Sequence, residues 1–104
     1  MYSRVTLLEI DTMRASVADV VARFEREVVP RLREQAGFEG TLALATPEGK
    51  GLLITLWASE DAVLAAAGFA TAALDEFATL FRSPPGREYY QVEYLELLGV
   101  VTGA

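Results

Sequence analysis

Residues 51–62, GLLITLWASEDA, decide the fold, because they join a strand that is apolar on both faces to the start of a helix. Side chains along a strand point alternately to the two faces of its sheet. A strand with one solvent-exposed face therefore alternates apolar and polar residues. The run from Leu52 to Trp57 is interrupted by a polar residue only at Thr55. We therefore expect both faces of this strand to be covered.

A helix is predicted directly after this strand, and it is expected to be broken. Ser59 is a suitable N-cap, and the two acidic residues that follow it place negative charge where the helix dipole favours it. An alanine-rich stretch continues the helix until Gly68 weakens it, and a further helical stretch follows. Residues 83–86, SPPG, end the second helical region.

The N-terminal third predicts a strand and then a helix. Residues 2–10 alternate as a strand, and Ser16 caps a helix whose apolar residues recur at helical spacing. Pro30 is expected to kink this helix or to restart its last turn, because proline lacks a backbone donor. The opposite side of the helix, predicted to be solvated, carries charges of alternating sign four residues apart: Asp19, Arg23, Glu27 and Arg31.

The remaining strands complete a ferredoxin-like order. Strands at 41–45 and 52–57 are joined by a glycine-containing turn, so they form a hairpin. Gly37 is the expected stop of the first helix, and residues 88–98 form the last strand. The order βαββαβ, with the second helix broken, predicts one α+β domain over residues 1–104, with a four-stranded antiparallel sheet and helices on one side.

Composition excludes several classes of function. The 104 residues suit one domain, and the net charge of −6 opposes binding to nucleic acid and to anionic membranes. The chain has no Cys and no His, so a catalytic triad cannot form, and the scattered carboxylates predict no metal site. The N-terminus shows no signal segment, so a cytoplasmic protein is expected.

The second face of the sheet predicts a homodimer. Helices can cover one face only, and the other would expose either Leu53 and Trp57 or Leu52, Ile54 and Leu56. A bare patch of several hundred Å² is at or above what monomers tolerate. Hydrophobic residues make up 52% of the chain, and packing two copies of the sheet face to face would bury this excess.

Three stretches resemble a known family: RVTLLEI (4–10), VVPRLREQAGFEGTLAL (28–44) and GLLITLWASEDAV (51–63). They are similar to the antibiotic-biosynthesis-monooxygenase-like domains of the dimeric α+β barrel superfamily, over roughly Arg4 to Tyr94. The resemblance implies a dimeric barrel. Some relatives oxidise polycyclic phenols with oxygen and no cofactor, and others degrade haem.

The resemblance implies no cofactor for this chain. The haem degraders use Asn, Trp and His at positions that correspond to about Ser3, Ala66 and Glu76 here, and none of these residue types is present at those positions. Without any imidazole, no histidine can ligate haem iron.

For the cofactor-free oxygenases, the resemblance implies a hydrophobic cavity between the helices and the sheet. The catalytic candidates are Arg4, Tyr90 and Tyr94, of which Arg4 could stabilise a phenolate. The expected lining residues are Thr6, Phe24, Trp57, Phe69 and Phe77. Structural roles are open alternatives: an ion pair of Arg4 with Glu93 or Glu96, core packing of Trp57, and interface packing of both tyrosines.

Two functions remain open at this point. One is a cofactor-independent monooxygenase acting on a small aromatic or polyketide-like molecule. The other is a non-catalytic homodimer that holds a small hydrophobic ligand or acts as a scaffold. A roomy pocket with a buried polar group near Arg4, Tyr90 or Trp57 would favour the enzyme, whereas a cavity filled by apolar side chains would favour the second function.

Overall fold

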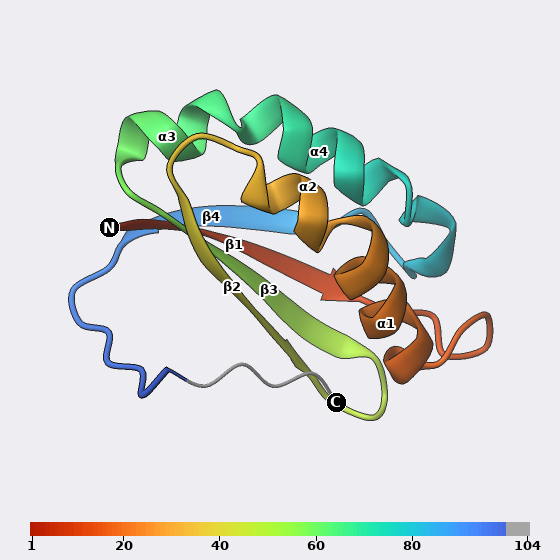
Figure 1. Ribbon diagram of the computed structural model, residues 1–104. Helices are drawn as coiled ribbons and strands as arrows, with labels where there is room; N and C mark the ends of the chain where they lie inside the picture. Colours follow the sequence, from red (N-terminus) through yellow and green to blue (C-terminus); the bar gives the residue numbers. More distant parts are fainter. Residues whose placement is uncertain (100–104) are drawn as a thin grey trace.

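The computed structural model describes residues 1–99 and shows an antiparallel sheet with helices on one face (Figure 1). The four strands lie in the order β2-β3-β1-β4. This is the predicted ferredoxin-like α+β arrangement. The elements are β1 (Tyr2–Glu9), α1 (Val17–Glu27), α2 (Val29–Arg33), β2 (Phe38–Ala45), β3 (Lys50–Trp57), α3 (Glu60–Ala65), α4 (Ala67–Asp75), the 3-10 turn η1 (Ala78–Leu80) and β4 (Gly86–Gln91).

The register between β1 and β3 settles which side chains face the helices. Tyr2 lies opposite Trp57 and Thr6 lies opposite Leu53. Tyr2 and Trp57 both belong to the core beneath the helices, so Leu53 shares that side. The helix-free face of β3 therefore carries the other set of residues considered above, Leu52, Ile54 and Leu56.

Trp57 is part of the core. Its side chain is 1% exposed, and its indole N–H donates a hydrogen bond to Thr55 Oγ1 at 3.0 Å. Phe38 meets the indole edge to face, with 5.4 Å between the ring centroids. Because the polar atom of the ring is already bonded within β3, burial of this large side chain leaves no unmet donor.

Both helical regions are interrupted. Ser16 and Ser59 cap α1 and α3, each accepting from the backbone N–H three residues on. The first region restarts at Val29, where Pro30 occupies the opening turn and needs no donor. The second region breaks at Ala66, two residues before Gly68. None of the helices within residues 1–99 has the length and apolar character that a membrane crossing requires.

The last strand is shorter than predicted. β4 ends at Gln91 and does not continue to Leu98. It pairs only with β1, and Gln91 lies opposite Tyr2, where β1 begins. Beyond Gln91 there is therefore no further residue of β1 for β4 to pair with. Residues 92–99 follow outside the sheet, on the side away from the helices (Figure 1).

Replacing Gly37 by alanine is predicted to destabilise the fold. Gly37 has φ +81°, and a Cβ there would lie 2.7 Å from the Cβ of Ala62 at the start of the second helical region. We expect Gly37→Ala to lower the free energy of unfolding by about 1–3 kcal/mol in urea denaturation. The control is Gly68→Ala, because a Cβ at Gly68 meets nothing within 4 Å. The control should instead stabilise the helix, by roughly 0.5–1 kcal/mol. Equal stability of wild type and Gly37→Ala would contradict the close contact.

Candidate functional site

A cavity of about 200 Å³ lies between the sheet, helix α4 and the segment that leads into β4. Strands β1 and β4 form its floor, and α4 forms a wall. The lining residues are Arg4, Thr6, Thr71, Leu74, Asp75, Pro84, Pro85, Gly86 and Arg87. This is a mixed surface, with apolar leucine and proline groups beside charged ones.

Arg4 is the most unusual side chain of the cavity. It lies in the middle of the sheet on the helix side, between Thr55 of β3 and Tyr89 of β4, and is only 3% exposed. One terminal nitrogen, Nη1, donates to the carbonyl of Ala67 at a long 3.4 Å. Its Nε is buried and has no hydrogen-bond partner. A guanidinium has five N–H donors, and the one on Nε is unsatisfied here.

The electrostatics of the cavity leave Arg4 without a counterion. Burial lowers the pKa of Arg4 from its ordinary value, the positive charge of Arg87 acts in the same direction, and Tyr89 acts against them. An arginine nevertheless stays charged in proteins. Within residues 1–99, no carboxylate forms an ion pair with it. A buried cation without a partner is costly, and such a group is a candidate for function.

The structure does not pair Arg4 with Glu93 or Glu96, so that alternative is wrong. Both glutamates follow the end of β4 and are exposed, whereas Arg4 points toward the helices. Glu96 instead accepts a hydrogen bond from Tyr94 at 2.6 Å. The cause is the early end of β4, which removes these carboxylates from the sheet.

Of the residues expected to line the pocket, Thr6 contributes to this cavity and the aromatic ones lie elsewhere. Thr6 is buried on β1, two residues after Arg4 on the same face. Trp57 and Phe77 are core residues, and Phe24 and Phe69 pack against that core. The aromatic side chains therefore hold the helices on the sheet rather than surrounding the cavity.

Tyr90 and Tyr94 lie away from Arg4 and the cavity. Tyr90 faces the helix-free side, opposite Ser3, and Tyr94 is 80% exposed in the segment after β4. Tyr90 donates to Glu88 and Tyr94 to Glu96, and these hydrogen bonds raise the pKa of each phenol. A raised pKa leaves less of each tyrosine as phenolate at neutral pH, so neither is poised to act as a general base.

Three polar lining residues went unnoticed in the sequence: Thr71, Asp75 and Arg87. Thr71 and Asp75 are four residues apart on α4, a spacing that places them on one helix face. Arg87 lies directly opposite Thr6 across β1 and β4. The helical spacing was visible in the sequence, but the strand register that brings Arg87 to the cavity was not.

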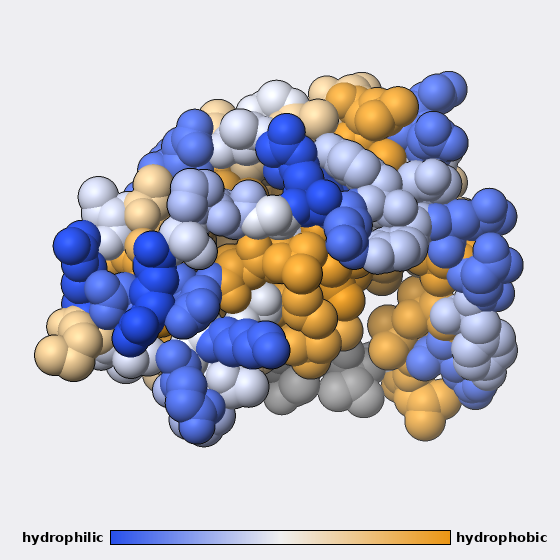
Figure 2. Space-filling model, turned by 180° about the vertical axis from the view of Figure 1, so that it is seen from behind, coloured by the Kyte–Doolittle hydropathy of each residue, from blue (hydrophilic) through white to orange (hydrophobic). Residues whose placement is uncertain are grey.

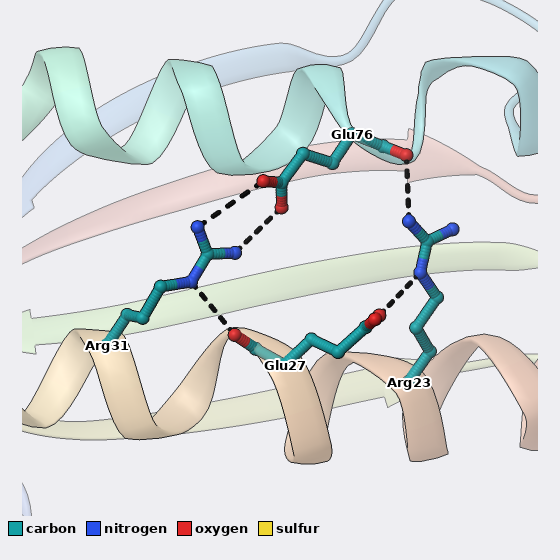
Figure 3. A network of polar contacts seen from close by, with 4 residues as sticks. All are labelled: Arg23, Glu27, Arg31 and Glu76. Carbon is teal, nitrogen blue, oxygen red and sulfur yellow. Dashed lines mark hydrogen bonds and ion pairs between the residues drawn. The ribbon is translucent and has the colours of Figure 1, made fainter.

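A charged network holds the end of α4 against α1 and α2 (Figure 3). Both terminal nitrogens of Arg31 donate to the carboxylate of Glu76, at 2.7 and 3.3 Å. Arg23 donates to the Glu76 carbonyl at 3.1 Å and to the Glu27 carboxylate at 2.6 Å. Its guanidinium also lies 4.3 Å from the Phe77 ring centroid. The helix face predicted to be merely solvated therefore makes contacts with α4, next to cavity residues Leu74 and Asp75.

Comparison with solved structures identifies the fold. One match is a protein from Nitrosomonas europaea provisionally named an antibiotic biosynthesis monooxygenase, with a TM-score of 0.70, 14% identity, and coverage of 90% of this chain and 100% of that one. The chain has the fold of the antibiotic biosynthesis monooxygenases. At such identity the likeness concerns the fold and not the activity.

Two further structures of this monooxygenase fold come from Streptomyces. A monooxygenase of Streptomyces coelicolor, solved with the ligand nanaomycin D, has a TM-score of 0.65 and 20% identity over 92% of this chain and 90% of that chain. A mutant of a cofactor-independent oxygenase from Streptomyces nogalater has a TM-score of 0.64 and 15% identity over 95% and 97%. Comparison of the sequence with protein-family models and with curated proteins gives no match.

The ion pair of Arg31 with Glu76 predicts a loss of stability in acid. The hydrogen bonds and charge of Arg31 lower the pKa of Glu76. A lowered folded-state pKa means that the pair stabilises the fold fully above the unfolded value, about 4.3 for Glu. That stabilisation is lost as the pH falls through the folded value. The difference in unfolding free energy between wild type and Glu76→Gln should therefore shrink from pH 7 to pH 3. Glu48→Gln, in the exposed hairpin turn, is the control, and a difference independent of pH would contradict the ion pair.

Proposed function

We propose that the chain is a cofactor-independent monooxygenase that oxidises a small aromatic molecule in the Arg4 cavity. The observation that carries this proposal is the buried guanidinium of Arg4, a cavity-lining residue that has no counterion among the described residues and whose Nε has no hydrogen-bond partner there. Structures of the same fold named as monooxygenases, one of them cofactor-independent, support it. A cavity with a buried charge also favours chemistry over a purely scaffolding role.

The chemistry follows from where this charge lies. A phenol or enol bound with its oxygen at Arg4 would lose its proton more readily, because the guanidinium stabilises the anion. The electron-rich carbanion form of such an anion reacts directly with oxygen. For a ring CH₂ group, the products are a ring C=O and water. One oxygen atom enters the product and the other leaves as water, and the substrate supplies all four electrons. No other reductant is required.

We further propose that the protein forms a homodimer, in which two copies pack together through the helix-free face of the sheet. That face exposes apolar side chains, among them Leu7, Leu42, Leu44, Leu52 and Tyr90. Figure 2 shows apolar atoms gathered in the middle of the molecule, below the helical layer. A groove of about 660 Å³, lined in part by Leu7, Leu44 and Leu52, reaches the same face. A second copy of the sheet would cover both features.

Charge on the helix-free face is predicted to separate the dimer. Leu42 is 51% exposed on this face, and Leu42→Glu would place a carboxylate in the proposed interface. We expect a dimeric mass for wild type and a monomeric mass for Leu42→Glu in light scattering after size exclusion. Leu64 on α3 is similarly exposed, at 53%, but lies outside that face. Leu64→Glu should therefore remain dimeric. A monomeric wild type at micromolar concentration would contradict the proposed interface.

Oxygen consumption tests the proposed activity. With an anthrone-type phenol or a single-ring hydroquinone under air, wild type should exceed the no-protein control, and Arg4→Met should fall back toward it by about 100-fold or more. Arg33 is an exposed arginine at the end of α2, so Arg33→Met is the matched control and should keep the wild-type rate. Rates equal to the no-protein control for all three proteins would contradict the oxygenase and leave the ligand-binding role.

A further inference from the structure

The charges around the cavity do not balance. Arg4 and Arg87 each contribute a positive charge to its lining, and Asp75 contributes a negative one. The lining therefore carries one net positive charge, although the chain as a whole carries −6. Arg87 and Asp75 are exposed and solvated, whereas Arg4 is not. One negative charge would therefore neutralise the lining, and it is Arg4 that lacks a counterion within residues 1–99.

The room beside Arg4 bears on what can supply that charge, and the cavity is open on the side where Thr71, Asp75 and Arg87 are exposed. Ordinary ligand pockets measure about 300–1,000 Å³, and this one measures about 200 Å³. An apolar cavity of about 150 Å³ holds one benzene ring. The space beside Arg4 therefore suits one aromatic ring with a small substituent. Leu74, Pro84 and Pro85 offer the ring an apolar surface, and Thr6 and Thr71 offer hydroxyl groups.

We infer that the cavity binds a monoanion with a single aromatic ring, whose ionised oxygen is held by the guanidinium of Arg4. This rests on the cavity of the proposed function and narrows its ligand class from small aromatic or polyketide-like molecules to single-ring aryl carboxylates and phenolates, of which only the phenolates can undergo the proposed oxidation. Both supply the same anionic oxygen. A dianion would exceed the one net positive charge, and a neutral ring would leave the guanidinium buried and unpaired.

Binding of benzoate tests charge and size together. Benzoate should bind wild type in calorimetry or ligand-observed NMR at low salt, and its neutral counterpart benzamide should bind about tenfold more weakly or worse. Phthalate, a dianion, and anthracene-9-carboxylate, with three rings, should also bind more weakly than benzoate. Failure of benzoate to bind, or equal affinity for benzoate and benzamide, would overturn the inference.

Ionisation of 4-nitrophenol gives a second, spectroscopic readout, because its anion is coloured. With excess wild-type protein, the absorbance titration should shift to lower pH, since Arg4 stabilises the phenolate. Arg33→Met should give the same shift, and Arg4→Met should give none. An equal shift with Arg4→Met would overturn the assignment to Arg4. Addition of benzoate should move the apparent pKa of 4-nitrophenol back toward its value without protein. Such a reversal would show that both anions bind at the same site.

Stability separates this reading from a structural role for the arginine. If the charge of Arg4 is compensated only by a bound anion, the ligand-free protein holds an uncompensated buried charge. Arg4→Met removes that charge and should leave the thermal midpoint of the ligand-free protein unchanged or raise it. The same variant should lose the stabilisation that benzoate gives to wild type. A large drop in the apoprotein midpoint would show that Arg4 is satisfied within the fold and overturn the inference.

The two proposals fail separately. If benzoate binds through Arg4 and no phenol is oxidised, the anion site stands and the oxygenase does not. If a phenol is oxidised in an Arg4-dependent way and benzoate and 4-nitrophenolate do not bind, the oxygenase stands and the monoanion site does not.

Discussion

Antiparallel pairing of β1 with β3 is the constraint on which the rest of the molecule depends. Because side chains alternate along both strands, one register assigns every residue to the helix side or to the open side. Trp57 lies on the helix side and anchors the core there, which places Leu52, Ile54 and Leu56 on the other face. The same alternation places Arg4 under the helices, where it is 3% exposed. The proposed dimer surface and the proposed anion site are thus two consequences of one register.

The broken second helix completes the site. The chain interrupts its helix at Ala66, so that α4 starts beside Arg4 and offers it the carbonyl of Ala67. The network around Glu76 fixes the other end of α4, and a lining residue, Asp75, lies next to it. Helix α4 is therefore held at both ends around a cavity that is left open in between. Holding a pocket wall by contacts on rigid elements preserves its shape without filling it.

Much of the fold could be predicted from the sequence because its signals are local. Capping by Ser16 and Ser59, the proline restart at Pro30 and the apolar run of β3 depend on neighbours along the chain. The position of Tyr90 could not be predicted in this way. The face of the sheet on which Tyr90 lies depends on which side of β1 the helices cover, and the length of β4 depends on where β1 begins. Both depend on pairing between strands that are far apart in the sequence.

The candidate site was predictable only in part, for the same reason. Arg4 and Thr6 were candidates because the resemblance implies a cavity between the helices and the sheet, and both lie on the first strand. Arg87 looked like an ordinary residue at the start of a strand, and only the register sets it across from Thr6. The aromatic residues were expected in the cavity because the resemblance implies a hydrophobic one between the helices and the sheet, but they pack in or against the core that attaches the helices. They therefore leave the cavity to Arg4, Thr6 and the residues of α4 and of the segment before β4.

The central claim is that the fold buries the guanidinium of Arg4 without a counterion, and that a bound anionic ligand supplies one. A high-resolution crystal structure of the protein grown with 4-nitrophenolate tests it most directly. We expect ring density in the cavity, with the phenolate oxygen within hydrogen-bond distance of the Arg4 guanidinium. A guanidinium bonded only to protein groups or fixed water, with no ligand density in the cavity, would contradict the claim.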